Sequence, residues 1–90
     1  MATIKIPSYY EPFTSGDTVF ISNADTAGGV LEDFLTKYPD IRPLIYTHWG
    51  ILSANVVIYK NTNEIFSLQG LETPMSDKDR LILVPTASGG

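Results

Sequence analysis

The last residues of the chain carry its clearest chemical signal. After Pro85 the sequence reads Thr86-Ala87-Ser88-Gly89-Gly90, a run of small residues whose side chains offer little to pack. We expect residues 86–90 to form an exposed, flexible tail. Because glycine makes up about 7% of an average protein, two terminal glycines arise by chance in only about 0.5% of chains. An inert end, or the remnant of a tag, remains the plain alternative.

A carboxylate that follows two glycines suits one kind of reaction. Such a carboxylate can enter a deep, narrow active site, because Gly89 and Gly90 have no Cβ atom to obstruct the slot. A free carboxylate is a poor acyl donor, so it first becomes a mixed anhydride by attack on the α-phosphate of ATP. A sulfur nucleophile can then displace AMP and leave a thiocarboxylate on Gly90. A partner enzyme would supply positioning and electrostatics, so the chain needs no catalytic side chain.

The composition excludes most other chemistry. The chain has no cysteine, which rules out disulfides, thiolate metal sites, a cysteine nucleophile and a persulfide held on a thiol. Its single histidine, His48, cannot build a transition-metal site by itself. We therefore expect no metal and no bound cofactor, with ATP consumed by the activating partner. The chain is expected to be a carrier or substrate protein and not an enzyme.

Charge and hydropathy limit the partners. The net charge is −4 at pH 7 and the pI is about 4.6, so the surface repels a phosphate backbone. The apolar runs are far shorter than the ~20 residues that span a bilayer, and the N-terminus shows no signal-peptide pattern. We expect no nucleic-acid partner, no membrane partner and a cytoplasmic location. The basic residues are scattered: Lys5, Lys37, Arg42, Lys60, Lys78 and Arg80.

The first half of the chain predicts a hairpin and a helix. Residues 3–6 and 18–21 are β-branched stretches separated by a proline-containing polar segment, which is typical of a hairpin with a long loop. Asp25 or Thr26 can cap a following helix, and Pro39 ends it. One apolar stripe runs along this helix: Val30, Leu31, Phe34, Leu35 and Tyr38. Residues 40–53 have no clear period and predict a short helical turn and a loop.

The second half predicts another hairpin and a central strand. Residues 56–59 and 65–68 are rich in β-forming side chains, and they flank Asn61-Thr62-Asn63, which suits a tight turn. Residues 80–84 are apolar on both faces, as in an inner strand that Pro85 stops. Two hairpins, one amphipathic helix and a last strand predict an α+β β-grasp fold, with one helix on a mixed sheet of about 4–5 strands. The predicted domain covers residues 1–85, and the last strand is expected to pair parallel with the first.

Alternation along the last strand predicts a surface patch. If Leu81 and Leu83 point toward the helix, Ile82 and Val84 point away from it. We expect Ile82 and Val84 to join Tyr59 or Phe66 in an exposed apolar patch that binds a partner. The acidic group Glu64, Glu72, Asp77 and Asp79 is interpreted either as plain solvated surface or as a group that steers docking onto a basic partner.

Residues 55–90 resemble the C-terminal half of ThiS/MoaD-type sulfur carriers. The shared elements are an Asn-containing hairpin turn, the Gly70-Leu71-Glu72-Thr73 segment, Asp77-Lys78-Asp79, an apolar strand, a proline and Gly89-Gly90. The first half is similar more loosely, in its TIKIP opening, Gly16-Asp17-Thr18 and Thr26-x-Gly28. It is most similar to members that supply sulfur for cysteine synthesis. The turn Lys60-Asn61-Thr62-Asn63 and the tail residues Thr86-Ala87-Ser88 depart from the pattern of many relatives.

The resemblance implies a function and its partners. The Gly90 carboxylate would be adenylated by a ubiquitin-activating-like enzyme, converted to a thiocarboxylate with sulfur from a donor, and passed to an acceptor enzyme. Gly89 and Ser88 would lie in the partner's active-site channel. The acceptor would be a cysteine synthase, or else the large subunit of molybdopterin synthase, with thiamine synthesis third. Two alternatives stay open: a small subunit of molybdopterin synthase, and a ubiquitin-like protein modifier.

Overall fold

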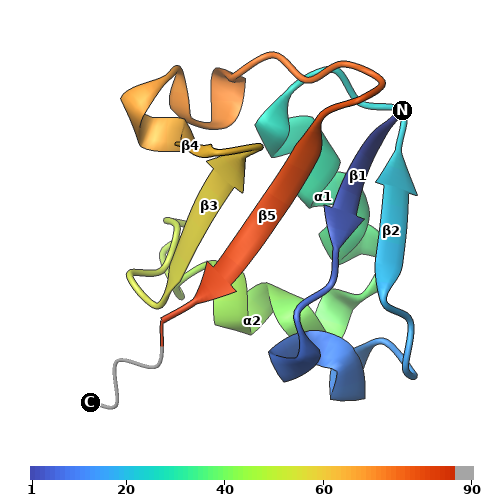
Figure 1. The fold of residues 1–90 in the computed structure, drawn as a ribbon. Helices are drawn as coiled ribbons and strands as arrows, with labels where there is room; N and C mark the ends of the chain where they lie inside the picture. Colours follow the sequence, from blue (N-terminus) through green and yellow to red (C-terminus); the bar gives the residue numbers. More distant parts are fainter. Residues whose placement is uncertain (87–90) are drawn as a thin grey trace.

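Five strands form one mixed sheet in the order β2-β1-β5-β3-β4 (Figure 1). The computed structural model describes residues 1–86. The strands are β1 (Ala2–Lys5), β2 (Val19–Ser22), β3 (Val56–Lys60), β4 (Asn63–Glu64) and β5 (Arg80–Pro85). β5 pairs parallel with β1 and antiparallel with β3, so the last strand occupies the middle of the sheet as predicted.

Helix α1 (Ala27–Lys37) covers one face of this sheet. Its N-cap is Thr26, whose hydroxyl oxygen accepts a hydrogen bond from the Gly29 N–H at 3.0 Å. The predicted apolar stripe is buried and joins one core cluster with inward-facing strand residues such as Ile4, Ile58 and Leu81. These elements confirm the predicted β-grasp fold.

The connecting segments contain short helices. A 3₁₀ helix, η1 (Ser8–Phe13), fills the loop of the first hairpin. After α1 come η2 (Pro39–Ile41) and the single-turn helix α2 (Arg42–Ile45), which agree with the helical turn predicted there. The 3₁₀ helix η4 (Gly70–Glu72) packs against α1 on the way to β5.

The second hairpin is shorter than predicted. Its turn is as expected, because Asn61 adopts a left-handed backbone conformation with φ of 55°. However, β4 holds only two residues, and the stretch 65–68 is the 3₁₀ helix η3 (Ile65–Ser67) instead of a strand. The Glu64 carboxylate accepts a hydrogen bond from the Phe66 N–H, and the Ser67 hydroxyl donates to the Glu64 carbonyl oxygen at 2.6 Å. These local hydrogen bonds compete with strand pairing and turn the backbone.

Candidate functional site

The chain leaves the sheet at Thr86, directly after β5. The Thr86 N–H donates to the carbonyl oxygen of Asn55 at 2.9 Å, and its hydroxyl donates to the carbonyl oxygen of Ala54 at 3.2 Å. Both acceptors lie just before β3, so Thr86 continues the β3–β5 ladder by one residue. Two hydrogen bonds therefore hold Thr86, the last described residue, to the segment just before β3.

The predicted reactive residues follow this anchor. Ser88, Gly89 and Gly90 lie outside the described residues, as does Ala87. Their assigned roles in activation and in partner binding remain predictions.

Alternation along β5 separates a core face from an outer face. Leu81 and Leu83 are buried in the core, whereas Ile82 is half-buried and Val84 is 40% exposed on the opposite face. The orientation expected for these residues is therefore the observed one. Val84 lies opposite Val57 on β3, and Ile82 lies opposite Tyr59. Because cross-strand partners share a face, these four side chains form one apolar patch, the outer patch.

Phe66 lies beside the outer patch, on η3 and not on a strand of the sheet. It is 61% exposed and lies on η3, directly after the edge strand β4. There it lines a hollow of about 260 Å³ together with Ile51 and Val57. Phe66 could be placed on the sheet only by treating residues 65–68 as a strand. Val57 is a member of the outer patch that was not predicted, and the alternation of Val56 and Ile58, both buried, around Val57 is the sequence signal that could have found it.

The acidic residues near the start of β5 are engaged inside the domain. One Asp79 oxygen accepts from the Asn61 side-chain amide at 3.0 Å, and the other accepts from the Ser76 N–H at 2.8 Å. With Lys60 also 3.6 Å away, these contacts lower the pKa of Asp79 from 3.8 to about 2, the Asn61 hydrogen bond being the largest cause. Asp77 forms an ion pair with the N-terminal ammonium group. Glu64 lies on β4 and Glu72 on η4.

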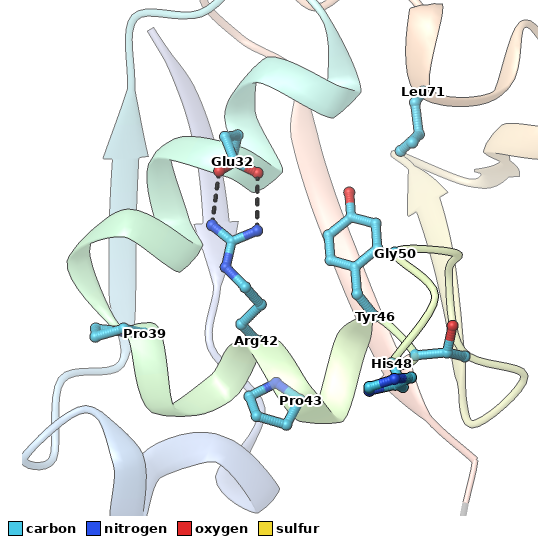
Figure 2. Close-up of a pocket in the computed structure, with 9 residues that line it drawn as sticks. Glu32, Pro39, Arg42, Pro43, Tyr46, His48, Gly50 and Leu71 are labelled. Atoms are coloured by element: carbon cyan, nitrogen blue, oxygen red, sulfur yellow. Dashed lines mark hydrogen bonds and ion pairs between the residues drawn. The ribbon is translucent and has the colours of Figure 1, made fainter.

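The groove drawn in Figure 2 lies on the helix side of the domain and has a volume of about 840 Å³. Its charged groups neutralise each other: Arg42 makes two hydrogen bonds to the Glu32 carboxylate, at 2.6 and 3.2 Å. Burial, with this carboxylate nearby, raises the pKa of Tyr46. No buried side-chain nitrogen or oxygen within residues 1–86 lacks a hydrogen-bond partner. We assign no reaction to this groove.

The described part of the chain shows neither a metal-binding cluster nor a membrane-spanning helix. Residues 1–86 contain no cluster of three or more His, Cys, Asp or Glu side chains that could hold a metal ion. Within the same range, no helix has the length and apolar character needed to cross a bilayer.

The family model described as "ThiS family" matches residues 4–90, which is almost the whole chain and includes both final glycines. The chain belongs to the ThiS family. Among similar proteins are the sulfur carrier proteins CysO of Mycobacterium tuberculosis and Mycobacterium bovis. Each is 31% identical over 90 residues, with 98% of this chain and 97% of the relative covered.

Solved structures support the same relationship for this ThiS-family chain. The crystal structure of M. tuberculosis CysO superposes with a TM-score of 0.83 at 28% identity, covering 96% of this chain and 99% of that one. The solution structure of small archaeal modifier protein 1 from Methanosarcina acetivorans superposes with a TM-score of 0.87 at 26% identity, covering 99% and 95%. A chain of the BexX/CysO complex from Amycolatopsis orientalis, at 22% identity, shares the fold with a TM-score of 0.86 over both full chains.

Proposed function

We propose that this ThiS-family protein is a sulfur carrier whose reactive group is the Gly90 carboxylate at the end of the mature chain. The observation that carries the proposal is that the family match runs through Gly89 and Gly90, in a chain whose relatives are sulfur carrier proteins. The chain has no cysteine thiol that could hold the sulfur instead.

The proposed reaction has two steps. A Gly90 carboxylate oxygen attacks the α-phosphorus of ATP in an adenylating enzyme, and pyrophosphate leaves. Hydrosulfide, or sulfur presented at that oxidation level by a donor, then attacks the carbonyl carbon, and the bond to AMP breaks. The product is a thiocarboxylate with no net oxidation or reduction. The adenylating enzyme supplies the catalytic groups, and the carrier supplies the acyl group and the surface that docks it.

The anchor at Thr86 suits this role. Four residues follow it, and a fully extended chain of that length reaches at most about 14 Å. Because the starting point is fixed by hydrogen bonds to Asn55 and Ala54, docking of the domain would set the position of the terminal carboxylate within that reach. Two final residues without side chains would fit a narrow channel.

The outer patch is the surface proposed to dock onto the enzyme. Ile82, Val84, Val57 and Tyr59 lie on β5 and β3, the two strands that end beside the Thr86 anchor. A partner that covers this patch would therefore hold the start of the tail at the partner's surface. The BexX/CysO complex shows that a relative of the same fold associates with another protein.

By its likeness to CysO proteins, we propose an acceptor in cysteine synthesis and a cytoplasmic place of action. A second candidate is a protein modifier, which the likeness to small archaeal modifier protein 1 favours. There, the activated Gly90 would be attacked by a lysine amine and form an isopeptide bond. Tagged protein in a cell lysate would then appear in high-mass conjugates, whereas a carrier would appear as a single free species.

ATP–pyrophosphate exchange catalysed by the adenylating enzyme tests the proposal. We expect exchange to depend on the wild-type chain and to be lost when Gly89 and Gly90 are deleted. An Ile82→Asp chain should remain folded but show a higher KM, with Thr36→Asp on the exposed side of α1 as the matched control. Undiminished exchange with the shortened chain would refute the role of Gly90, and a normal KM for Ile82→Asp would refute the docking patch.

A further inference from the structure

The side chains of three of the six basic residues have no ion-pair or hydrogen-bond partner among residues 1–86. Arg42 pairs with Glu32, Lys60 lies 3.6 Å from Asp79, and Lys37 lies over the Tyr38 ring at 5.5 Å from its centre. Within the described part of the chain, the side chains of Lys5, Lys78 and Arg80 make no ion pair and no hydrogen bond. In a chain with a net charge of −4, free cations gathered in one region need an explanation.

Two of these cations share the outer face of the sheet. In β1, Ile4 is buried and Lys5 is exposed, and in β5, Leu81 is buried and Arg80 is exposed. The parallel register places Lys5 beside Ile82 and Thr3 beside Arg80. Lys5 and Arg80 are therefore diagonal neighbours, with Cα atoms about 8 Å apart from the strand spacing and rise. Both flank Ile82, the member of the outer patch that lies beside β1.

A hollow lies beside these two cations, next to the β1–β5 pair. It has a volume of about 360 Å³, and its lining includes Lys5, Arg80 and Ile82 with the Pro7-Ser8 turn. The hollow is large enough for one partner side chain. Glu11 lies at its rim, but this carboxylate forms no ion pair with Lys5 or Arg80, so both charges remain available.

The outer face is thus polarised. Among the strand residues of this face, the carboxylate is that of Glu64 on β4, which lies opposite Tyr59 of β3. Because β4 lies two strands away from β5, Glu64 is about 10 Å from β5. Between Glu64 and the two cations lie the apolar side chains of the outer patch. Such a face favours a partner with negative charge at one side of an apolar centre, and it disfavours the reversed orientation.

We propose that Lys5 and Arg80 form a carboxylate-binding corner of the docking surface, and that the adenylating partner places an Asp or Glu side chain in the hollow beside Ile82. This inference rests on the proposed function, because it names the chemistry of the partner at that surface. The corner sets the orientation in which the domain docks, and hence the direction in which Thr86 releases the chain toward the enzyme. The carrier would therefore be recognised through its few cations and not through its excess of acidic residues.

Charge reversal with a matched control tests the inference. Lys5→Glu and Arg80→Glu are compared with Lys37→Glu, which changes the net charge equally but lies on α1, across the sheet. The probe is the adenylating enzyme that loads the wild-type chain, and the readouts are the KM for the carrier and its dependence on salt. We expect the KM to rise about tenfold for each of the first two variants and less than about twofold for Lys37→Glu. Circular dichroism should show all three folded, because each substituted side chain is exposed.

Zero-length carbodiimide coupling identifies the partner group directly. The reagent joins the Lys5 amine only to a carboxylate in contact with it, so we expect a Lys5 cross-link to an Asp or Glu of the enzyme. Lys5→Arg should keep the KM within about twofold and lose the cross-link. A Lys5 cross-link to a second copy of this chain, or an equal loss of affinity in Lys37→Glu, would overturn the inference. If the wild-type chain is loaded and both reversals keep its KM, the corner is refuted while the proposed function stands; if the wild-type chain is never loaded, both fail.

Discussion

Asn61 and Asp79 join the turn of the β3–β4 hairpin to the start of β5. The Asn61 side-chain amide donates to the Asp79 carboxylate at 3.0 Å, while its side-chain oxygen accepts from the Arg80 N–H at 3.0 Å. The Asn61 N–H in turn donates to the Arg80 carbonyl oxygen at 2.9 Å. The left-handed turn residue thus also fixes the register in which the central strand enters the sheet. Because β5 carries Thr86 and the tail at its other end, this contact helps to position the site.

Asp79→Asn should destabilise the domain. The substitution replaces one of the two acceptor oxygens with an NH2 group, so the side chain can keep the hydrogen bond from Asn61 or from Ser76 but not both, and we expect a loss of about 1–2 kcal/mol in unfolding free energy at pH 7. Urea denaturation measures this loss. Asp77→Asn is the control: its side chain is 93% exposed, and its surface ion pair with the N-terminus should contribute less than about 0.5 kcal/mol. Equal losses in the two variants would contradict the role of Asp79.

The contribution of Asp79 should depend on pH. Its pKa is lowered from 3.8 to about 2 in the folded domain, chiefly by the Asn61 hydrogen bond. A lowered folded-state pKa stabilises the protein at pH values above the unfolded pKa, and this stability is lost as the pH falls toward the folded value. The difference in unfolding free energy between wild type and Asp79→Asn should therefore narrow between about pH 4 and pH 2. A difference that stays constant from pH 7 to pH 2 would show that the carboxylate charge does not matter.

Two neighbouring residues of β5 should respond differently to truncation. Leu83 is 2% exposed, so Leu83→Ala should cost about 2–4 kcal/mol through a cavity in the core. Val84 is 40% exposed on the opposite face, and Val84→Ala should cost less than about 1 kcal/mol. Denaturant unfolding of both variants provides the comparison. Similar losses at the two positions would contradict the assignment of the faces.

Thr86 is expected to act as a positioning residue. Thr86→Pro removes the N–H that binds the Asn55 carbonyl oxygen, so the chain should leave β5 in a less defined direction. We expect loading of Gly90 to slow about tenfold, with an unfolding free energy within about 1 kcal/mol of wild type. Thr86→Val keeps the N–H and loses only the bond to Ala54, so it should slow loading less. Unchanged loading of Thr86→Pro would show that the anchor does not position the tail.

Much of the fold could be predicted from local patterns. The stripe from Val30 to Tyr38 gives the helix and its buried face, and Thr26 gives its start. The apolar run that follows Arg80 predicts the central strand, because a strand with neighbours on both edges often has a continuous apolar sequence. These signals are local and repeat along the sequence, so they can be read without knowledge of tertiary contacts.

Other features depend on contacts that the sequence pattern does not specify. Ile65 and Phe66 are strong strand formers, yet the carboxylate and the carbonyl oxygen of Glu64 accept hydrogen bonds from Phe66 and Ser67, and residues 65–67 form a 3₁₀ helix. The meeting of Lys5 and Arg80 depends on the parallel register of β1 and β5, which lie at opposite ends of the chain. The network around Asp79 likewise joins two segments that are far apart in the sequence, the β3–β4 turn and the loop before β5, so a charge that looked available for docking is used within the fold.

The central claim concerns the final carboxylate, and the intact mass of the protein tests it most directly. The purified chain is incubated with ATP, its adenylating enzyme and sulfide, and its mass is compared with that of a sample without ATP. Replacement of one terminal oxygen by sulfur adds about 16 Da, and fragmentation should place the added mass on Gly90. A mass that stays unchanged in the presence of an enzyme that adenylates the chain, or an added mass located before Gly90, would contradict the account.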